Sequence, residues 1–203
     1  MRVLAASLFF ALLAIRSANA SEPVDRLESY ITAFSSVDGF PSEGDELVQL
    51  AAKFREKQLK VANEIAFVDL LFSKTRQRFL RNYAEYASFS ETLGKGTYNC
   101  LTGTAVYALL LEHFEIPYQI IETNYHIFLI ACTDNGRVLL EATDGQSGFV
   151  TGEENINARV REYRQGLPSG NQNDKAYYKY DANLFKQVSL DELTGLLYYN
   201  RAI

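Results

Sequence analysis

The sequence predicts an α+β domain, in which helices come first and an antiparallel sheet follows. Three observations support this fold class. Residues 22 to about 90 place apolar side chains at the spacing of amphipathic helices. Three apolar runs between Tyr118 and Ala142 resemble strands, and a turn signal separates the last two. A closing helical pattern begins at Ser189, so helices and strands are segregated along the chain.

The first twenty residues predict a secretory signal peptide. Arg2 supplies a positive start, residues 3–15 are apolar, and Ala18-Asn19-Ala20 is a small-residue cleavage site. This apolar run is too short for a membrane anchor, because about twenty such residues are needed to cross a bilayer core. The expected mature protein is therefore a single domain, residues 21–203, that is periplasmic or secreted. No later segment is long and apolar enough to span a membrane.

Residues 21–93 are expected to form a helical lead-in. Their apolar positions recur at helical spacing in two groups, namely Leu47, Leu50, Ala51, Phe54 and Leu59, and then Ile65, Val68, Leu71 and Phe72. Pro41-Ser-Glu-Gly44 predicts a break between the first helix and the second.

Residues 94–150 are expected to form the catalytic core of the domain. Gly94-Lys-Gly96 indicates a loop, and Asn99 or Thr97 can then cap a helix that ends near His113. Three strands are predicted, at residues 118–121, 127–131 and 138–142. The segment Thr133-Asp-Asn-Gly136 between the last two strands is a strong hairpin signal.

Residues 151–203 are expected to contain a loop and a closing helix. Structural signals are weak after Gly145, and residues 166–174 have the composition of an exposed loop. Ser189-Leu-Asp-Glu192 is a capping box, which predicts a final helix that carries Leu190, Leu193, Leu196, Leu197 and Tyr198.

Composition excludes several classes of function. The formal net charge is −5 and there is no basic block, so nucleic acid and anionic membranes are poor candidate partners. The chain has two cysteines and two histidines, and none of them has the spacing of zinc ligands. We therefore expect no metal and no cofactor.

The cysteines and histidines allow four thiol–imidazole pairs, and geometry removes two of them. Cys100 and His113 lie at opposite ends of one predicted helix, roughly 20 Å apart. Cys132 and His126 are separated by a similar distance along one predicted strand, roughly 20 Å. Of the two remaining pairs, Cys100–His126 has the better chemistry, because free N–H groups at a helix N-terminus lower the pKa of a thiol and can hold an oxyanion. Cys132 has no such field, and His113 is expected to be a helix-end residue.

The acid that would orient the imidazole depends on the register of the hairpin. A four-residue loop, Thr133 to Gly136, makes Glu141 the diagonal neighbour of His126 on one face of the sheet. A three-residue loop places Asp144 opposite His126 instead. Both acids are candidates for the same role, which is to hold the imidazole and stabilise its charged form.

Four segments together resemble the bacterial transglutaminase-like superfamily, which has a papain-like fold. They are Tyr98-Asn-Cys-Leu-Thr-Gly-Thr-Ala-Val-Tyr-Ala-Leu-Leu-Leu111, Ile116-Pro-Tyr118, Tyr125-His-Ile-Phe-Leu129 and Val138-Leu-Leu-Glu-Ala-Thr143. The resemblance covers about residues 70–150. It implies a cysteine helix packed on an antiparallel sheet that carries a histidine and an acid.

Carried over residue by residue, the resemblance implies Cys100 as nucleophile, His126 as base and Glu141 as the acid. The family places an aspartate in an Asp-x-Thr setting after the histidine strand, and Glu141-Ala-Thr143 occupies that place here. The chain has no tryptophan, so an indole cannot donate to an oxyanion. Tyr98 or the Cys100 backbone N–H would have to do so.

Two functional hypotheses follow. The first is an exported thiol enzyme that acts on peptide or glutamine amides through a thioester, as a peptidase, an amidase or a transglutaminase-type acyltransferase. The second is a non-catalytic module of the same fold that binds peptide or glycan through its aromatic side chains, which include thirteen tyrosines and thirteen phenylalanines. We expect no Cys100–Cys132 disulfide, because it would consume the nucleophile.

Overall fold

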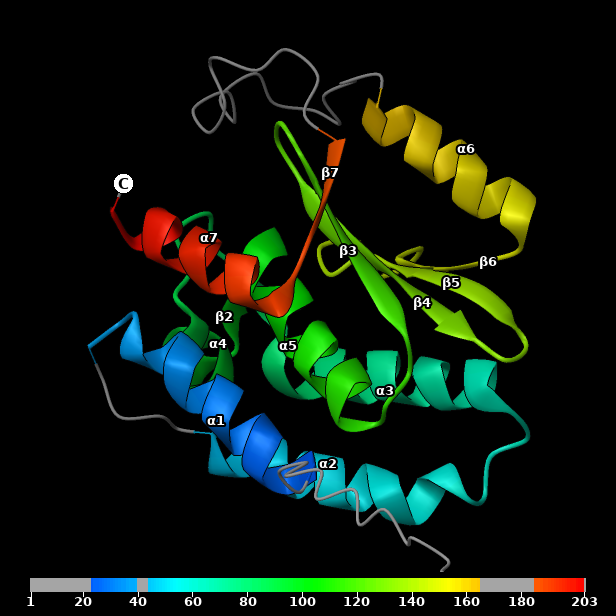
Figure 1. The fold of residues 1–203 in the computed structure, drawn as a ribbon, viewed down its shortest axis with the longest axis horizontal. Coiled ribbons are helices and arrows are strands. Elements are labelled where there is room, and N and C mark those ends of the chain that lie inside the picture. The colour runs from blue at the N-terminus through cyan, green and yellow to red at the C-terminus, as the bar shows by residue number, and fades with distance from the viewer. Residues whose placement is uncertain (1–22, 40–43, 165–184, 203) are drawn as a thin grey trace, which may run out of the picture.

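The structure, a computed structural model, describes residues 23–39, 44–164 and 185–202. The chain has mixed α+β architecture, in which most helices gather on one side of an antiparallel five-stranded sheet (Figure 1). The strand order is β6-β5-β4-β3-β7, with antiparallel pairing between all neighbours. A parallel pair, β1 and β2, lies outside this sheet.

The described helices and strands follow the order expected from the sequence, helices first and then the sheet, with several additional short elements. The helices are α1 (Pro23–Ser36), α2 (Asp45–Gln58), α3 (Glu64–Phe79), α4 (Phe89–Lys95), α5 (Cys100–His113), α6 (Glu153–Arg164) and α7 (Leu190–Ala202). The strands are β1 (Asn82–Tyr83), β2 (Thr97–Tyr98), β3 (Tyr118–Thr123), β4 (Ile127–Thr133), β5 (Gly136–Leu140), β6 (Phe149–Thr151) and β7 (Phe185–Val188).

Helix α5 forms the centre of the main core. Every residue from Leu101 to Leu111 is buried, including the polar threonines. A helix that is apolar on all sides can be stable only when it is surrounded, and α1, α3, α4, α7 and the sheet surround it. Tyr107 is fully buried, stacks on Phe72 and donates its hydroxyl proton to the Phe72 carbonyl. The helix thus has one defined orientation relative to α3.

The two faces of the sheet belong to different cores, because successive side chains of a strand point in opposite directions. One face joins the α5 core through Ile120, Leu129, Ala131, Val138 and Leu140. The other face carries a smaller cluster, whose buried members are Ile121, Phe128, Ile130, Leu139 and Ile156. Ile156 belongs to α6, which covers this second face (Figure 1).

Several local elements differ from those predicted from the sequence. Gly94 and Lys95 end helix α4 rather than forming a loop, and Gly96 then adopts the left-handed conformation that stops the helix. Leu59 is not part of the buried stripe, since it follows α2 and is 92% exposed. Helix α6 and strand β7 were missed within residues 151–203. In α6 only Ile156 is buried, so the apolar periodicity is too sparse to signal a helix.

Other expectations were confirmed. Asn99 caps α5 in a reciprocal capping box with Thr102, and the helix ends at His113. Ser189 and Glu192 form the capping box that begins α7. The predicted signal peptide, most of the break at residues 41–44 and the loop at residues 166–174 lie outside the described residues.

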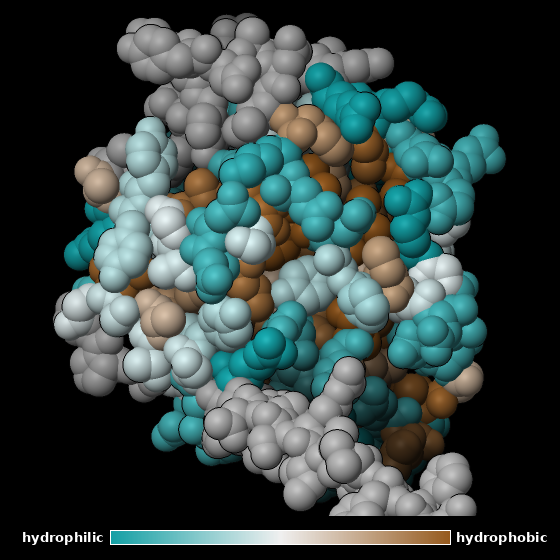
Figure 2. All heavy atoms as spheres, in the orientation of Figure 1, coloured by the Kyte–Doolittle hydropathy of each residue, from teal (hydrophilic) through white to brown (hydrophobic). Residues whose placement is uncertain are grey.

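The surface seen in Figure 2 is mostly hydrophilic, and hydrophobic side chains are visible between the polar ones. Among the residues that the structure describes, no helix combines the length and apolar character needed to cross a bilayer.

Candidate active site

Cys100 is the first residue of α5, and its position is set by the Asn99 cap. The Asn99 side chain accepts from the Thr102 N–H at 2.9 Å, and the Thr102 hydroxyl accepts from the Asn99 N–H at 3.1 Å. The Cys100 N–H lies ahead of the first intrahelical bond, where a helix leaves its N–H groups without partners in the helix itself. Cys100 is a free cysteine and the residue is half-buried. It therefore lies in the positive end of the helix field and within reach of solvent.

The cap is itself anchored to distant parts of the chain. The Asn99 amide donates to the Glu85 carbonyl at 2.8 Å and to the Asn200 side chain at 3.1 Å. The Asn200 amide in turn donates to the Ala87 carbonyl at 3.2 Å. Helix α7 thus helps to position the residue before the thiol. Sequence analysis missed Asn200, because a link across about a hundred residues leaves no local pattern.

His126 is held at the turn that joins β3 to β4. Its backbone N–H donates to the Thr123 hydroxyl at 3.0 Å, and its carbonyl accepts from the Thr123 N–H at 2.8 Å. The next residue, Ile127, is tied to the cysteine helix, since its carbonyl accepts from the Thr104 hydroxyl at 3.3 Å. The imidazole side chain is 13% exposed. The histidine turn and the cysteine helix are therefore fixed relative to each other.

Glu141 follows β5 and turns its carboxylate toward His126. The side chain is 2% exposed, and its Oε2 contacts the imidazole Nε2. The same oxygen accepts from the Tyr163 hydroxyl at 2.9 Å. The other oxygen accepts from the Thr143 N–H at 2.9 Å and from the Thr143 hydroxyl at 2.7 Å. Each carboxylate oxygen therefore has two polar partners, as a buried charge requires.

The charges of this group are strongly coupled. Burial alone would lower the pKa of His126, but the Glu141 carboxylate and the hydrogen-bonded Cys100 thiol raise that pKa to about 10. Burial would likewise raise the pKa of Glu141, but His126 and Thr143 lower it to about 2. Since Glu141 occupies Nε2, the imidazole nitrogen left for Cys100 is Nδ1. The arrangement favours an imidazolium between a carboxylate and a thiol.

The register of the hairpin distinguishes the two candidate acids. Cys132 lies opposite Arg137, which is the register that the predicted four-residue loop gives. Thr133 and Gly136 also pair, so the loop itself is only Asp134-Asn135. Asp144 is not beside His126. Its carboxylate accepts from the backbone N–H groups of the turn that follows it, and it forms an ion pair with Arg159 at 3.2 Å.

The remaining candidates occupy structural positions. Tyr98 is 4% exposed in the main core, and its ring packs edge-on against Tyr83. His113 is the last residue of α5, and its ring packs against Phe114. Cys132 lies near the far end of β4 from His126, and both cysteines are free thiols. Of the two candidate oxyanion donors, only the Cys100 N–H lies at the first turn of α5.

Close packing fixes the loop that carries Glu141. A Cβ atom at Gly103 of α5 would lie 2.7 Å from the Ala142 Cβ, so helix and loop touch there. Gly148 closes the loop by accepting from the Glu141 N–H at 2.8 Å, and a Cβ at that position would lie 2.4 Å from the Glu141 carbonyl. Arg76 of α3 donates to the Ala142 carbonyl at 3.1 Å.

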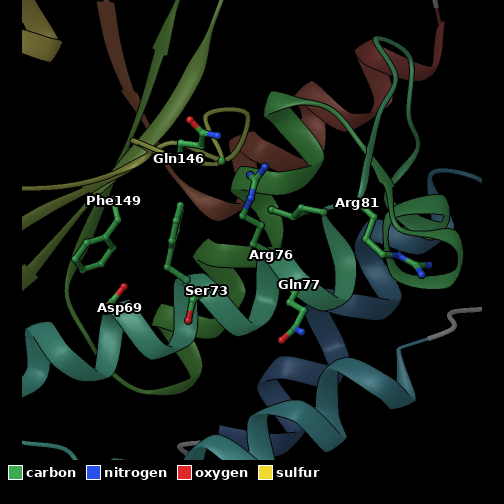
Figure 3. A pocket seen from close by; sticks show the side chains of 10 residues that line it. Asp69, Ser73, Arg76, Gln77, Arg81, Gln146 and Phe149 are labelled. Carbon is green, nitrogen blue, oxygen red and sulfur yellow. The ribbon is translucent and has the colours of Figure 1, made fainter.

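A groove of about 620 Å³ lies between α3 and the start of β6 (Figure 3). Its lining residues come from α3, the segment after it and the turn before β6, and they are Asp69, Phe72, Ser73, Arg76, Gln77, Leu80, Arg81, Gly145, Gln146 and Phe149. In Figure 3, Arg76 reaches from α3 toward Gln146, whereas the Arg81 side chain points away toward α4. Cys100, His126 and Glu141 do not line this groove.

In the described part of the chain, no group of three or more histidine, cysteine, aspartate or glutamate residues could hold a metal ion. Comparison with protein-family models, with curated proteins and with solved structures found no significant match. The interpretation of the site therefore depends on its geometry.

Proposed function

We propose that this protein is an exported thiol enzyme that acts on amides of peptides or of glutamine side chains. The observation that carries the proposal is the contact between the His126 imidazole and the buried Glu141 carboxylate, with the Cys100 thiol on the adjoining helix N-terminus helping to raise the pKa of that imidazole. A nucleophile, a base and a group that orients the base are the parts that covalent acyl transfer needs. We extend the proposal to the fold, as a transglutaminase-like, papain-like core.

The chemistry follows from the charges. The Cys100 thiolate attacks the amide carbonyl carbon, a C–S bond forms, and the negative charge on oxygen faces the helix N-terminus. The C–N bond then breaks as the His126 imidazolium gives its proton to the leaving amine. Water attacks the resulting thioester, His126 takes a proton from it, and the C–S bond breaks to release an acid. An amine in place of water would yield a new amide, with the same proton transfers.

Alkylation of the two cysteines within one molecule tests the proposal. Cys132 is partly exposed like Cys100 and lies outside the site, so it serves as an internal control. At pH 6 an ordinary thiol is less than about 1% thiolate, since its pKa is about 8.5. We expect iodoacetamide to label Cys100 more than about tenfold faster than Cys132 at this pH, measured by peptide mapping. His126→Ala should remove the difference.

Equal labelling of the two cysteines in the folded protein would refute the activated thiol and favour a binding module. If Cys100 is selectively labelled, glutamine-containing peptides identify the reaction. Ammonia release indicates attack on the side-chain amide, and chain cleavage indicates a peptidase. Incorporation of an added amine indicates acyl transfer. Cys100→Ala should abolish each product.

A further inference from the structure

Helix α6 reaches the site from the second face of the sheet through Tyr163. The Tyr163 ring lies 5.1 Å from the His126 ring and 4.7 Å from the Phe128 ring, measured between centroids. Its backbone carbonyl accepts from the Tyr125 hydroxyl at 3.0 Å. Both the ring and the backbone of Tyr163 are therefore attached to the β3–β4 turn that carries His126.

The direction of the Tyr163 hydroxyl proton is set by two neighbours. Arg159, one turn earlier on α6, donates to the hydroxyl oxygen at 3.5 Å, and that oxygen lies 2.9 Å from Glu141 Oε2. Since a guanidinium can only donate, the proton of the phenol is directed to the carboxylate. Burial and the Glu141 charge raise the pKa of Tyr163, which keeps the phenol protonated.

Asp144, which lies in the same loop as Glu141, also contacts α6. It pairs with the same Arg159 NH1 group at 3.2 Å. A chain of polar contacts thus runs from Asp144 through Arg159 and Tyr163 to Glu141. The acid that does not reach His126 directly is therefore linked to Glu141 through α6.

We propose that Tyr163 is a positioning residue of the site, which holds the Glu141 oxygen that faces His126 and makes α6 part of the catalytic apparatus. This inference deepens the function proposed above and rests on it. Without the phenol, Glu141 Oε2 keeps His126 as its only side-chain partner described here. The buried carboxylate would then be less stabilised and freer to rotate.

Other titratable groups also face Glu141 and must be held constant in a test. They are His126 and Tyr125 from the β3–β4 turn and Tyr107 from α5, while Arg76 of α3 binds the adjoining carbonyl. Tyr163→Phe leaves all of these in place and keeps the ring contacts. It removes one hydrogen-bond donor.

The experiment is a ¹³C NMR titration of the Glu141 carboxyl carbon, assigned with Glu141→Gln. The Tyr163→Phe variant should raise the titration midpoint of Glu141 by about one pH unit, because a hydrogen bond to a charged group has about that effect. The matched control is Tyr198→Phe, which removes a phenol that is 54% exposed on α7, and it should leave the midpoint unchanged. Arg159→Gln should shift the midpoint in the same direction as Tyr163→Phe but less.

An unchanged midpoint in folded Tyr163→Phe would overturn the inference. The pH profile of Cys100 alkylation provides a second measurement, in which the acidic limb should move to higher pH with Tyr163→Phe. The two failures are distinguishable. A wild-type Cys100 without enhanced alkylation contradicts the proposed function, whereas the carboxyl titration still tests the contact between Tyr163 and Glu141.

Discussion

Replacing Gly103 with alanine tests whether packing between α5 and the Glu141 loop holds the site together. The new Cβ would lie 2.7 Å from the Ala142 Cβ, whereas ordinary contacts of this kind begin at 3.4 Å. Helix or loop must therefore move by about 0.7 Å, and neither contact atom is the end of a flexible side chain. Overpacking of this kind destabilises a protein by about 1–3 kcal/mol. The higher helix propensity of alanine than of glycine offsets about 1 kcal/mol of this.

Gly195→Ala is the matched control, because Gly195 also lies inside a helix, α7, and a Cβ there meets no atom within 4 Å. This variant should be stabilised by about 0.5–1 kcal/mol. The two variants should thus differ by about 1–3 kcal/mol in free energy of unfolding, measured by urea denaturation. Since 1 kcal/mol corresponds to about 2–4 °C in a protein of this size, thermal melting should show the same order.

The same substitution should also affect reactivity. Ala142 directly follows Glu141, so a shift at Ala142 moves the carboxylate relative to His126. Misplacements of about 1 Å can cost up to about a hundredfold in rate. We expect Gly103→Ala to slow Cys100 alkylation at pH 6 by about tenfold or more, while Gly195→Ala leaves it unchanged. If Gly103→Ala is as stable and as reactive as Gly195→Ala, the reasoning from close packing is wrong.

Two further predictions concern the charged pair and the cap. The pKa of His126, about 10, is above its ordinary value, so the stability that the charged imidazole contributes is complete below about pH 6.5 and is lost as pH rises toward 10. The pKa of Glu141, about 2, is below its ordinary value, so the stability that the carboxylate contributes is complete above about pH 4.5 and is lost as pH falls toward 2. Urea midpoints of wild type should therefore decline at both ends, and those of Glu141→Gln should be flatter. Asn99→Ala should cost about 1–2 kcal/mol, because it removes the cap of α5 and the hydrogen bond from Asn99 to Asn200. An unchanged urea midpoint would contradict the capping role.

The parts of the site that could be predicted from sequence are those that depend on residues close together in the chain. Asn99 followed by Thr102 marks the start of α5, and this places Cys100 at a helix N-terminus. Strand periodicity places His126 near Glu141 and Asp144, but only the turn length decides between the acids. That length is a property of the folded hairpin, where Thr133 pairs with Gly136.

The parts that could not be predicted depend on contacts between distant segments. Tyr163 lies on a helix that packs one buried residue, Ile156, against the second face of the sheet, so α6 has little amphipathic signal. The only local clue was Arg159 four residues before Tyr163, a spacing that brings the two side chains together only if the segment is helical. Asn200 likewise becomes recognisable only when α7 packs beside the α5 cap.

A buried ion pair such as His126–Glu141 is seldom needed for stability alone, so its presence points to a functional role. The free energy needed to remove two charges from water often exceeds the free energy gained from their attraction. A protein with apolar residues of similar size in their place would therefore often be as stable. Here the chain surrounds the carboxylate with four polar contacts, from His126, Tyr163 and twice from Thr143. The pKa of the same imidazole is also raised by Cys100, a half-buried residue at a helix N-terminus.

A purely structural pair would have no need of this thiol, of its solvent access or of a second helix on the far side of the sheet. Perturbed titratable groups that converge on a nucleophile are characteristic of catalytic sites. The arrangement therefore supports the proposed thiol chemistry rather than a purely structural role. Cys100→Ser separates the two explanations, since it should leave the free energy of unfolding within about 1 kcal/mol of wild type while abolishing any turnover of an amide substrate.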